Sequence, residues 1–254
     1  MTLQLRQRFM AGLYTAAFSW PGRLAMRRAF RAALPPLARL AGEELVGVPR
    51  RVLAITAHPD DLEFFAGGTL RRMALAGGEI HALVLTDGEK HGNYLQTGAL
   101  RRTEQRLAAR RQGFASVRFC GLPDFALAED PRVEGIVDRA WGELEPEVVF
   151  AFDPQELVAR MANRDHKALG RTVMDVTRRR LGSGARVYFY GTRQANVVVD
   201  IEAVLEAKWQ AIESHASQLI YLTRPAYQEG FRLIAQAFAT GSGCRYAEGL
   251  YRLV

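Results

Sequence analysis

Short apolar runs alternate with longer amphipathic stretches along most of this chain of 254 residues. The runs are rich in β-branched and aliphatic residues, as strands buried on both faces are, and lie at 52–57, 80–86, 117–120, 147–152 and 187–190. Between them, helical patterns cover 66–77, 98–112, 131–144 and 165–180. This alternation predicts an α/β fold with a doubly wound, mostly parallel sheet. Ligands bind such sheets at the carboxyl ends of the strands.

The two ends of the chain have a different texture. The C-terminal third predicts a strand at 197–200, two amphipathic helices at 201–217 and 226–239, and a last strand at 246–253. Residues 3–40 are rich in arginine, alanine and aromatic residues, and prolines divide them into two short helices. We therefore expect a basic helical extension over 1–48 and one main domain over 49–254.

Composition and charge narrow the function. Apolar residues make up 48% of the chain and charged residues 24%, which excludes disordered and fibrous classes. The net charge is +7, but residues 1–50 hold eight arginines and two glutamates, so the rest of the chain is almost neutral. A nucleic-acid partner is therefore not expected. The two cysteines have no metal-binding or disulfide spacing, and a cytoplasmic location is expected.

The N-terminal extension has two main interpretations. Arginines on one side and residues such as Phe9, Phe18 and Trp20 on the other are typical of a helix that lies in a membrane interface. That reading places residues 1–45 in peripheral contact with the inner face of the membrane. Alternatively, the helices pack on the main domain and extend their arginines into solvent. A cleaved signal peptide is a third, weaker reading, because Trp-Pro-Gly follows the apolar stretch instead of small residues.

A cluster of polar residues follows the first predicted strand. His58-Pro59-Asp60-Asp61 begins where Pro59 ends the strand, so one imidazole and two carboxylates reach the edge of the sheet together. His58 and Asp61 suit zinc as nitrogen and oxygen ligands, with Asp60 left to face a water. The alternative is a polar turn in which an aspartate caps the next helix.

A third ligand is available after the fourth main strand. Asn163-Arg164-Asp165-His166 lies at the start of the next helix, which places a second imidazole at the same edge. His166 by itself also fits an ordinary first turn of a helix. Catalytic zinc commonly has three protein ligands, and the matched positions favour a metal site.

These residues, with others spread along the chain, resemble a known family. The chain resembles the PIG-L/LmbE family of zinc-dependent N-acetylglucosaminyl de-N-acetylases. The segments similar to the motifs of that family are 57–61, Gly67-Gly68-Thr69-Leu70, Thr86-Asp87-Gly88-Glu89, Arg101 with Glu104, Asp165-His166, Lys208 with His215 and Gln218, and Tyr246-Ala247-Glu248. The similarity covers about 50–254 and implies an LmbE-like, Rossmann-like α/β fold. The N-terminal extension lies outside it.

The resemblance also implies roles for individual residues. His58, Asp61 and His166 would bind one zinc ion, Asp60 would be the general base, and Asp165 would belong to the catalytic group. The contacts expected to an N-acetylated amino-sugar conjugate come from Glu89, Arg101 and Asp124. The implied reaction is hydrolysis of the N-acetyl group by a water activated by zinc.

One position departs from the family pattern. Many members carry a histidine three residues before the last ligand, where this chain has Asn163. An amide donates a hydrogen bond to an oxyanion but cannot deliver a proton. Either His91 is the substitute acid, or Asp60 moves the proton in both directions, or the protein is a weak or inactive relative that binds a sugar conjugate or glycolipid. The sequence leaves open whether Lys208 and His215 reach the site, and also the oligomeric state.

Overall fold

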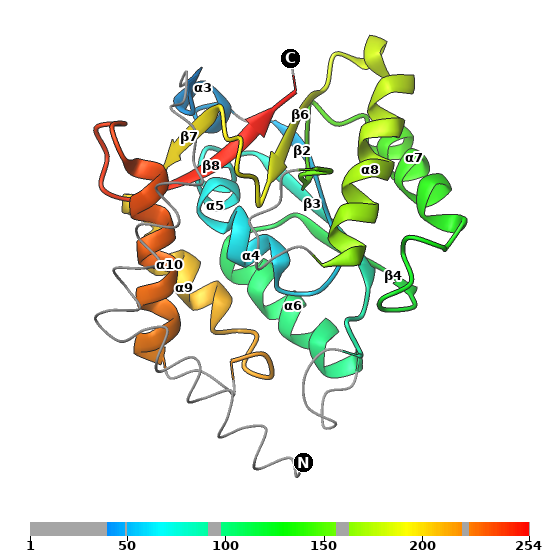
Figure 1. Cartoon of the computed structure of the whole chain (residues 1–254), viewed down its shortest axis with the longest axis horizontal. Coiled ribbons are helices and arrows are strands. Elements are labelled where there is room, and N and C mark those ends of the chain that lie inside the picture. Colours follow the sequence, from blue (N-terminus) through cyan, green and yellow to red (C-terminus); the bar gives the residue numbers. More distant parts are fainter. Residues whose placement is uncertain (1–39, 49, 91–97, 156–162, 220–223, 254) are drawn as a thin grey trace.

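The computed structural model describes residues 40–48, 50–90, 98–155, 163–219 and 224–253 (Figure 1). They form one eight-stranded sheet in the order β1-β7-β8-β6-β5-β2-β3-β4. Five parallel neighbours make its centre and one edge: β2 (Arg51–Thr56), β3 (Glu79–Thr86), β4 (Ser116–Leu122), β5 (Val148–Phe152) and β6 (Arg186–Tyr190). The other three are β8 (Ala247–Arg252), antiparallel to β6 and to β7 (Val197–Asp200), and β1 (Leu40–Ala41), parallel to β7. The predicted doubly wound, mostly parallel α/β fold is therefore confirmed.

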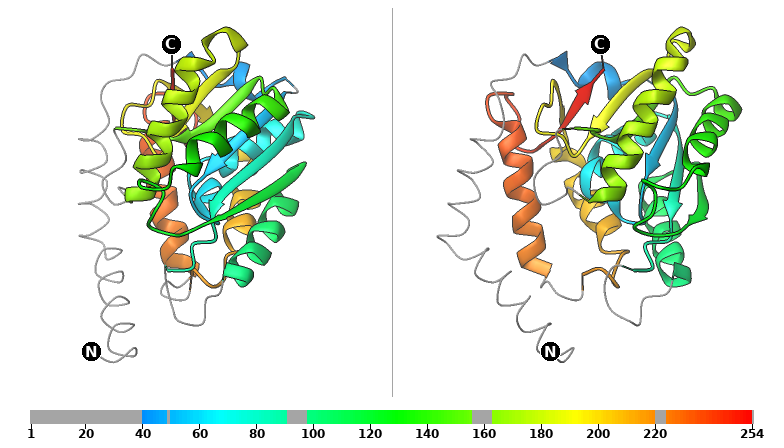
Figure 2. Two further views of the ribbon diagram at one scale, coloured as in Figure 1. Left: turned by 90° about the vertical axis from the view of Figure 1, so that its right-hand side faces the viewer. Right: turned by 45° about the vertical axis from the view of Figure 1, so that its right-hand side comes forward.

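Two pairs of helices connect the parallel strands. After β2, α5 (Gly67–Leu75) and α6 (Gly98–Gln112) lead to β3 and β4, and then α7 (Arg132–Leu144) and α8 (Arg164–Arg179) lead to β5 and β6. Crossovers between parallel strands are right-handed, and the winding direction reverses between β2 and β5, so the two pairs cover opposite faces (Figure 2). Open α/β sheets bind ligands in the crevice outside the strand ends at such a reversal, which here falls at the carboxyl ends of β2 and β5.

The core beneath that crevice is tightly packed. All of β5 is buried, and α8 approaches it closely at Gly170. A Cβ atom at Gly170 would lie 2.6 Å from the carbonyl oxygen of Phe152, so only glycine permits this approach. The first turn of α8 is thereby held against the end of β5.

Some element boundaries differ from the sequence expectation. The helix expected over 66–77 is confirmed as α5, and a short helix that was not expected, α4 (Asp61–Phe65), precedes it with a break at Ala66, where φ is −135°. The helix expected over 201–217 is shorter, a 3-10 turn (Glu202–Val204) followed by α9 (Leu205–Ile212). The last helix, α10 (Arg224–Ala239), lies close to its expected range.

Part of the expected extension joins the sheet. β1 pairs with β7, and the short helix α3 (Glu43–Val46) follows it, before the boundary expected at residue 48. Glu43 forms an ion pair with Arg72 of α5 at 2.8 Å. Residues 1–39 lie outside the described part of the chain, so their helices and their contact with a membrane stay predictions. Within the described residues, no helix is long and apolar enough to cross a membrane.

A buried ion pair fastens the C-terminal strand to the start of α5. The carboxylate of Glu248 on β8 accepts hydrogen bonds from the backbone nitrogens of Gly68 and Thr69 and from the Thr69 hydroxyl, at 2.7–2.8 Å. The ammonium of Lys208 on α9 completes the set at 2.6 Å from the same carboxylate. Lys208 therefore serves the packing of α5, α9 and β8.

Candidate metal centre

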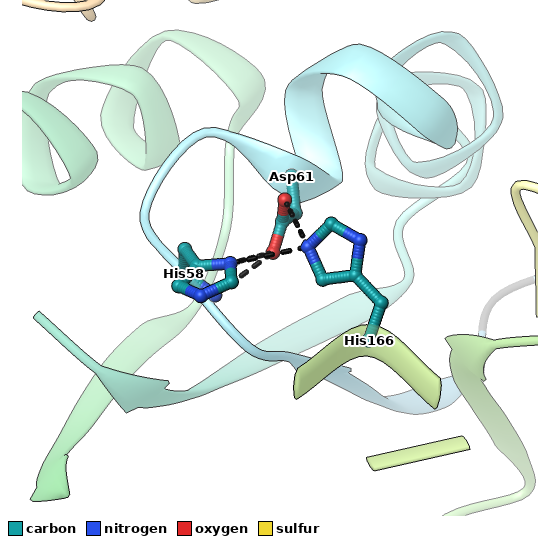
Figure 3. Close-up of side chains that lie close together, drawn as sticks. All are labelled: His58, Asp61 and His166. Atoms are coloured by element: carbon teal, nitrogen blue, oxygen red, sulfur yellow. Dashed lines mark hydrogen bonds and ion pairs between the residues drawn. The ribbon is translucent and has the colours of Figure 1, made fainter. Parts of the chain in front are cut away.

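Three segments that are distant in sequence meet at the carboxyl edge of the sheet. His58 lies between β2 and α4, Asp61 is the first residue of α4, and His166 lies in the first turn of α8 (Figure 3). Each of the three is at most 7% exposed. The predicted ligands are therefore brought together in a buried position at the reversal point of the sheet.

The donor atoms converge at distances that fit one small cation. His58 Nδ1 lies 3.1 Å from His166 Nε2 and 3.4 Å from Asp61 Oδ2, and His166 Nε2 lies 3.3 Å from Asp61 Oδ1. Ligand atoms about 2.0–2.2 Å from one tetrahedral zinc ion lie roughly 3.3–3.6 Å apart. Two imidazoles and one carboxylate are also a common donor set for zinc. The residues present therefore fit a zinc ion.

Neighbouring groups fix the orientation of two ligands. Asp61 Oδ2 accepts hydrogen bonds from the Thr56 hydroxyl and from the backbone nitrogen of His58, both at 2.8 Å. The His166 ring stacks on Phe152, with ring centroids 3.8 Å apart. Thr56 and Phe152 end β2 and β5, and the sequence analysis assigned no role to either.

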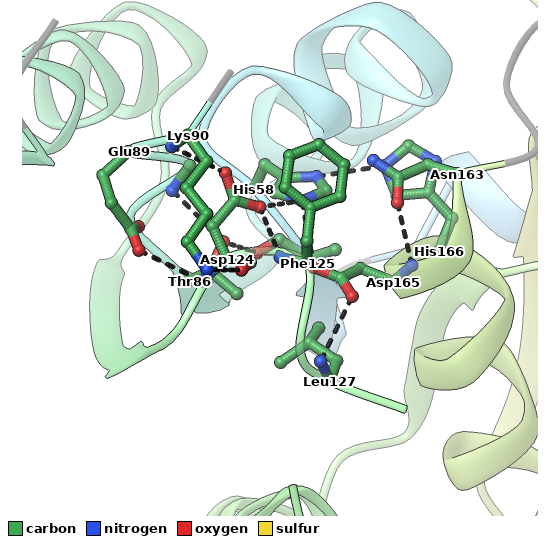
Figure 4. Close-up of polar contacts among 12 residues, drawn as sticks. His58, Thr86, Glu89, Lys90, Asp124, Phe125, Leu127, Asn163, Asp165 and His166 are labelled. Carbon is green, nitrogen blue, oxygen red and sulfur yellow. Dashed lines mark hydrogen bonds and ion pairs between the residues drawn. The ribbon is translucent and has the colours of Figure 1, made fainter. Parts of the chain in front are cut away.

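Two buried acids face the outer nitrogen of His58. Asp124 Oδ1 lies 3.0 Å from Nε2 and Asp165 Oδ2 lies 3.5 Å from it (Figure 4). Burial opposes a charge on His58, but these acids and Asp61 outweigh it and raise its pKa well above the ordinary value. Carboxylates placed in this way behind a ligand histidine set its tautomer and its ring orientation.

Asp124 lies in the loop that follows β4 (the β4 loop) and contacts two residues that follow β3. Asp124 accepts a hydrogen bond from the Lys90 backbone nitrogen at 3.0 Å, and its own backbone nitrogen donates to Glu89 Oε1 at 3.1 Å. Both Asp124 and Asp165 are fully buried, whereas Glu89 is exposed. Of the three residues predicted to contact substrate, Asp124 therefore lies behind His58, and Glu89 keeps an accessible side chain.

Asp60 lies beside the ligands in a strained conformation. Its φ is 97°, in the left-handed region, and such strain in a non-glycine residue is characteristic of functional sites. Its Oδ2 accepts a hydrogen bond from Arg101 at 3.1 Å. Burial raises its pKa to about 6, although the Arg101 guanidinium acts in the opposite direction. A carboxylate with a pKa near the working pH suits a general base.

Arg101 lies against the loop that carries Asp60. Its guanidinium also donates to the carbonyl oxygens of Pro59 and Gly88, both at 2.6 Å, and the residue is 2% exposed. Gly88 has a φ of 63°, and a Cβ there would lie 2.0 Å from the guanidinium. Arg101 is therefore placed to hold Asp60.

A second buried network lies behind Asp60. The backbone nitrogen of Asp60 donates to Gln105 Oε1 at 2.9 Å, and Gln105 Nε2 donates to Glu63 Oε1 at 2.9 Å. Glu63 Oε2 lies 3.3 Å from His215 Nε2, and none of these three side chains has measurable exposure. His215 therefore reaches the site indirectly. The sequence analysis missed Gln105, although it lies four residues after Arg101 and so shares its helix face.

Asn163 is the N-cap of α8. Its Oδ1 accepts a hydrogen bond from the Asp165 backbone nitrogen at 2.8 Å. Because the oxygen is used in this way, the amide nitrogen is the end of the side chain that serves as a donor. His91, the predicted substitute acid, lies outside the described residues.

Metal-dependent hydrolases use such an arrangement, in which a ligand set lies beside a carboxylate that is not a ligand. Residues 53–177 match the family model described as GlcNAc-PI de-N-acetylase, PIG-L. The diacetylchitobiose deacetylase of Thermococcus kodakarensis is 29% identical over 224 residues, which cover 79% of this chain and 82% of that protein. The chain therefore carries a PIG-L family domain, and its relatives support the class of metal-dependent amidohydrolases.

Solved structures agree with this assignment. N,N′-diacetylchitobiose deacetylase from Pyrococcus horikoshii has a TM-score of 0.71 and 26% identity, covering 80% of this chain and 83% of that one. GalB, a 4-carboxy-2-hydroxymuconate hydratase from Pseudomonas putida, has a TM-score of 0.67 and 21% identity, covering 81% and 96%. At that identity GalB shows a shared fold alone.

Proposed function

We propose that the protein is a zinc-dependent hydrolase that removes the N-acetyl group from a conjugate containing N-acetylglucosamine. The observation that carries the proposal is the convergence of His58 Nδ1, His166 Nε2 and the Asp61 carboxylate within 3.1–3.4 Å, beside the carboxylate of Asp60. The relatives support the substrate class, because two of them are named for diacetylchitobiose.

The chain supplies the proton transfers of the reaction. His58, Asp61 and His166 would hold a zinc ion, which when bound would lower the pKa of a water toward about 7 and polarise the acyl carbonyl. Asp60 accepts the proton of the attacking water, and its pKa of about 6 allows it to do so near neutrality. The proton then goes to the departing amine, and acetate and the free amine are the products.

The remaining roles follow from placement. We propose that the Asn163 amide nitrogen donates to the oxyanion and that Asp60 returns its proton to the amine, or that His91 supplies that proton. Arg101 positions Asp60, and Asp124 positions His58. The exposed Glu89 accepts a sugar hydroxyl.

Acetate release tests the proposal. Zinc-loaded protein is assayed on soluble and lipid-linked N-acetylglucosaminyl conjugates, beside Asp60→Asn and the control Asp175→Asn, which alters an exposed ion pair. We expect release by the wild type and the control, and a loss of about 10²–10⁴-fold in Asp60→Asn with zinc content kept. Full activity in Asp60→Asn would overturn the role of the base.

Asn163 supports a second candidate function. Asn163 stands where many family members have a histidine, which can deliver a proton. In this second function the protein binds a sugar conjugate without hydrolysing it. No acetate release by zinc-loaded protein, together with micromolar binding of a conjugate, would favour this function over the first.

We further propose that residues 1–45, through the part that precedes β1, make peripheral contact with the inner, anionic face of the membrane, which is consistent with a cytoplasmic protein. The support is the arginine-rich, aromatic composition of this segment. Sedimentation with vesicles tests it, using the full chain and a variant with glutamine for every arginine in 1–39. Binding to anionic vesicles that the variant keeps unchanged would contradict the proposal.

A further inference from the structure

A strained aromatic residue lies on the loop that follows β4. Phe125 has a φ of 60°, in the left-handed region, and is 42% exposed. In the described part of the chain it is the one aromatic residue among the exposed large apolar side chains. Glycine adopts this conformation without steric conflict, because it has no Cβ atom. A bulky side chain in the same conformation is an outlier. A ring that remains this exposed gains only part of the burial energy that would offset the strain.

The strain is maintained by the acids of the metal centre. The backbone nitrogen of Phe125 donates to Asp165 Oδ2 at 2.7 Å and to Asp124 Oδ1 at 3.0 Å. These two carboxylate oxygens are the atoms that lie 3.5 Å and 3.0 Å from His58 Nε2. The position of Phe125 is therefore fixed relative to a metal ligand through two buried side chains.

The same hydrogen bonds direct the ring to one side of the loop. Asp165 Oδ1 accepts a second bond from the backbone nitrogen of Leu127 at 3.1 Å, and the Leu127 side chain is buried. In Figure 4 the Phe125 ring extends toward the side where His58 and Asn163 lie, and Leu127 extends the opposite way. A partly exposed aromatic ring thus extends from the loop toward the side of the metal centre.

We propose that Phe125 is a specificity-determining residue whose ring receives the apolar C–H face of a pyranose ring of the conjugate. The inference rests on the proposed function and names the part of the substrate that the site recognises. An aromatic ring provides a large contact area with little conformational freedom to lose. A contact of this kind is made equally in the ground state and in the transition state, so it lowers KM and leaves kcat unchanged. The local strain is retained because the loop presents the ring to substrate.

Substitutions that separate strain from contact test this proposal. Phe125→Gly and Phe125→Asn remove the ring and suit the left-handed backbone. Phe125→Trp keeps an aromatic face. Leu181→Ala is the control, at an exposed site near the opposite edge of the sheet. Acetate release from N,N′-diacetylchitobiose gives kcat and KM. We expect KM to rise about tenfold in the Gly and Asn variants, with kcat and zinc content kept. The Trp variant and the control keep the wild-type KM, and Phe125→Gly unfolds at the same or a higher temperature than wild type.

A binding measurement separates this inference from the proposed function. Calorimetric titration of zinc-loaded Asp60→Asn protein with N,N′-diacetylchitobiose needs no turnover. A Kd that rises about tenfold when Phe125→Gly is added supports the role of the ring, even if the wild type releases no acetate. Three results would overturn the role of the ring. They are an unchanged Kd, no binding of the sugar by Asp60→Asn protein, and a lower unfolding temperature with loss of zinc in Phe125→Gly.

Discussion

The buried pair of Lys208 and Glu248 gives a quantitative test of the fold. Replacing Lys208 with methionine keeps most of its volume and removes the ammonium, which donates to Glu248 and to the carbonyl oxygen of Phe64. Glu248 is 4% exposed, so its carboxylate would stay buried with only the Gly68 and Thr69 donors. Breaking a buried ion pair in this way costs about 3–5 kcal/mol.

The cost translates into a measurable change in melting temperature. For a domain of this size, about 1 kcal/mol shifts the melting temperature by roughly 2–4 °C, so Lys208→Met should lower it by roughly 6–20 °C. Arg118→Met is the matched control, because its ion pair with Glu143 is about half exposed on both sides. Exposed pairs contribute about 0–1 kcal/mol, and the control should shift the temperature little.

Circular dichroism during heating and urea titration measure both variants. The double variant Lys208→Met with Glu248→Gln removes the second charge and should recover part of the loss. If Lys208→Met unfolds within about 1 kcal/mol of wild type, Glu248 does not depend on Lys208 and the reasoning is refuted.

Three further predictions concern the site. Asp124→Asn weakens the acceptor that faces His58 and should reduce the affinity for zinc about 10–100-fold, measured by competition with a chromogenic chelator. An unchanged affinity would contradict the role of Asp124 in orienting His58. Gln105→Leu removes the acceptor for the backbone nitrogen of Asp60, so kcat should fall while KM and zinc content stay, and a change in KM alone would argue against positioning. Burial opposes protonation of His215, but its contact with Glu63 outweighs this and raises its pKa. The stabilisation is complete below the ordinary value of about 6.5 and is lost as the pH rises through the folded value, so the stability gap between wild type and His215→Gln should narrow with rising pH.

The sequence predicted the sheet and the ligands for one physical reason. Parallel strands place their carboxyl ends at one edge, so polar residues after β2 and β5 had to meet there. His58, Asp61 and His166 are therefore recognisable from their position along the chain alone. The extra helix α4 and the break that separates it from α5 were not predictable in this way, because the backbone nitrogens at the start of α5 are capped by Glu248 from a distant strand.

The surroundings of the ligands depend on contacts across the fold. Asp124 follows β4 and looked like a residue that accepts a sugar hydroxyl, but the β4 loop turns its carboxylate inward onto His58. Gln105 lies on the buried side of α6, and only the hydrogen bond across the fold shows that it meets the backbone of Asp60. Such roles are set by which side chains face each other, and periodicity does not report this.

The charges of the site explain why its residues act as one unit. Asp61, Asp124 and Asp165 are each at most 4% exposed and surround His58, so three buried carboxylates share one imidazole. Buried charges are costly unless they are paired or bind a metal. Backbone nitrogens of the β4 loop stabilise Asp124 and Asp165, and a divalent cation between Asp61 and the two histidines would balance the remainder. The carboxylate oxygens that accept hydrogen bonds from the Phe125 backbone nitrogen are thus the ones that face the outer nitrogen of His58, so the β4 loop and this histidine depend on the same two acids.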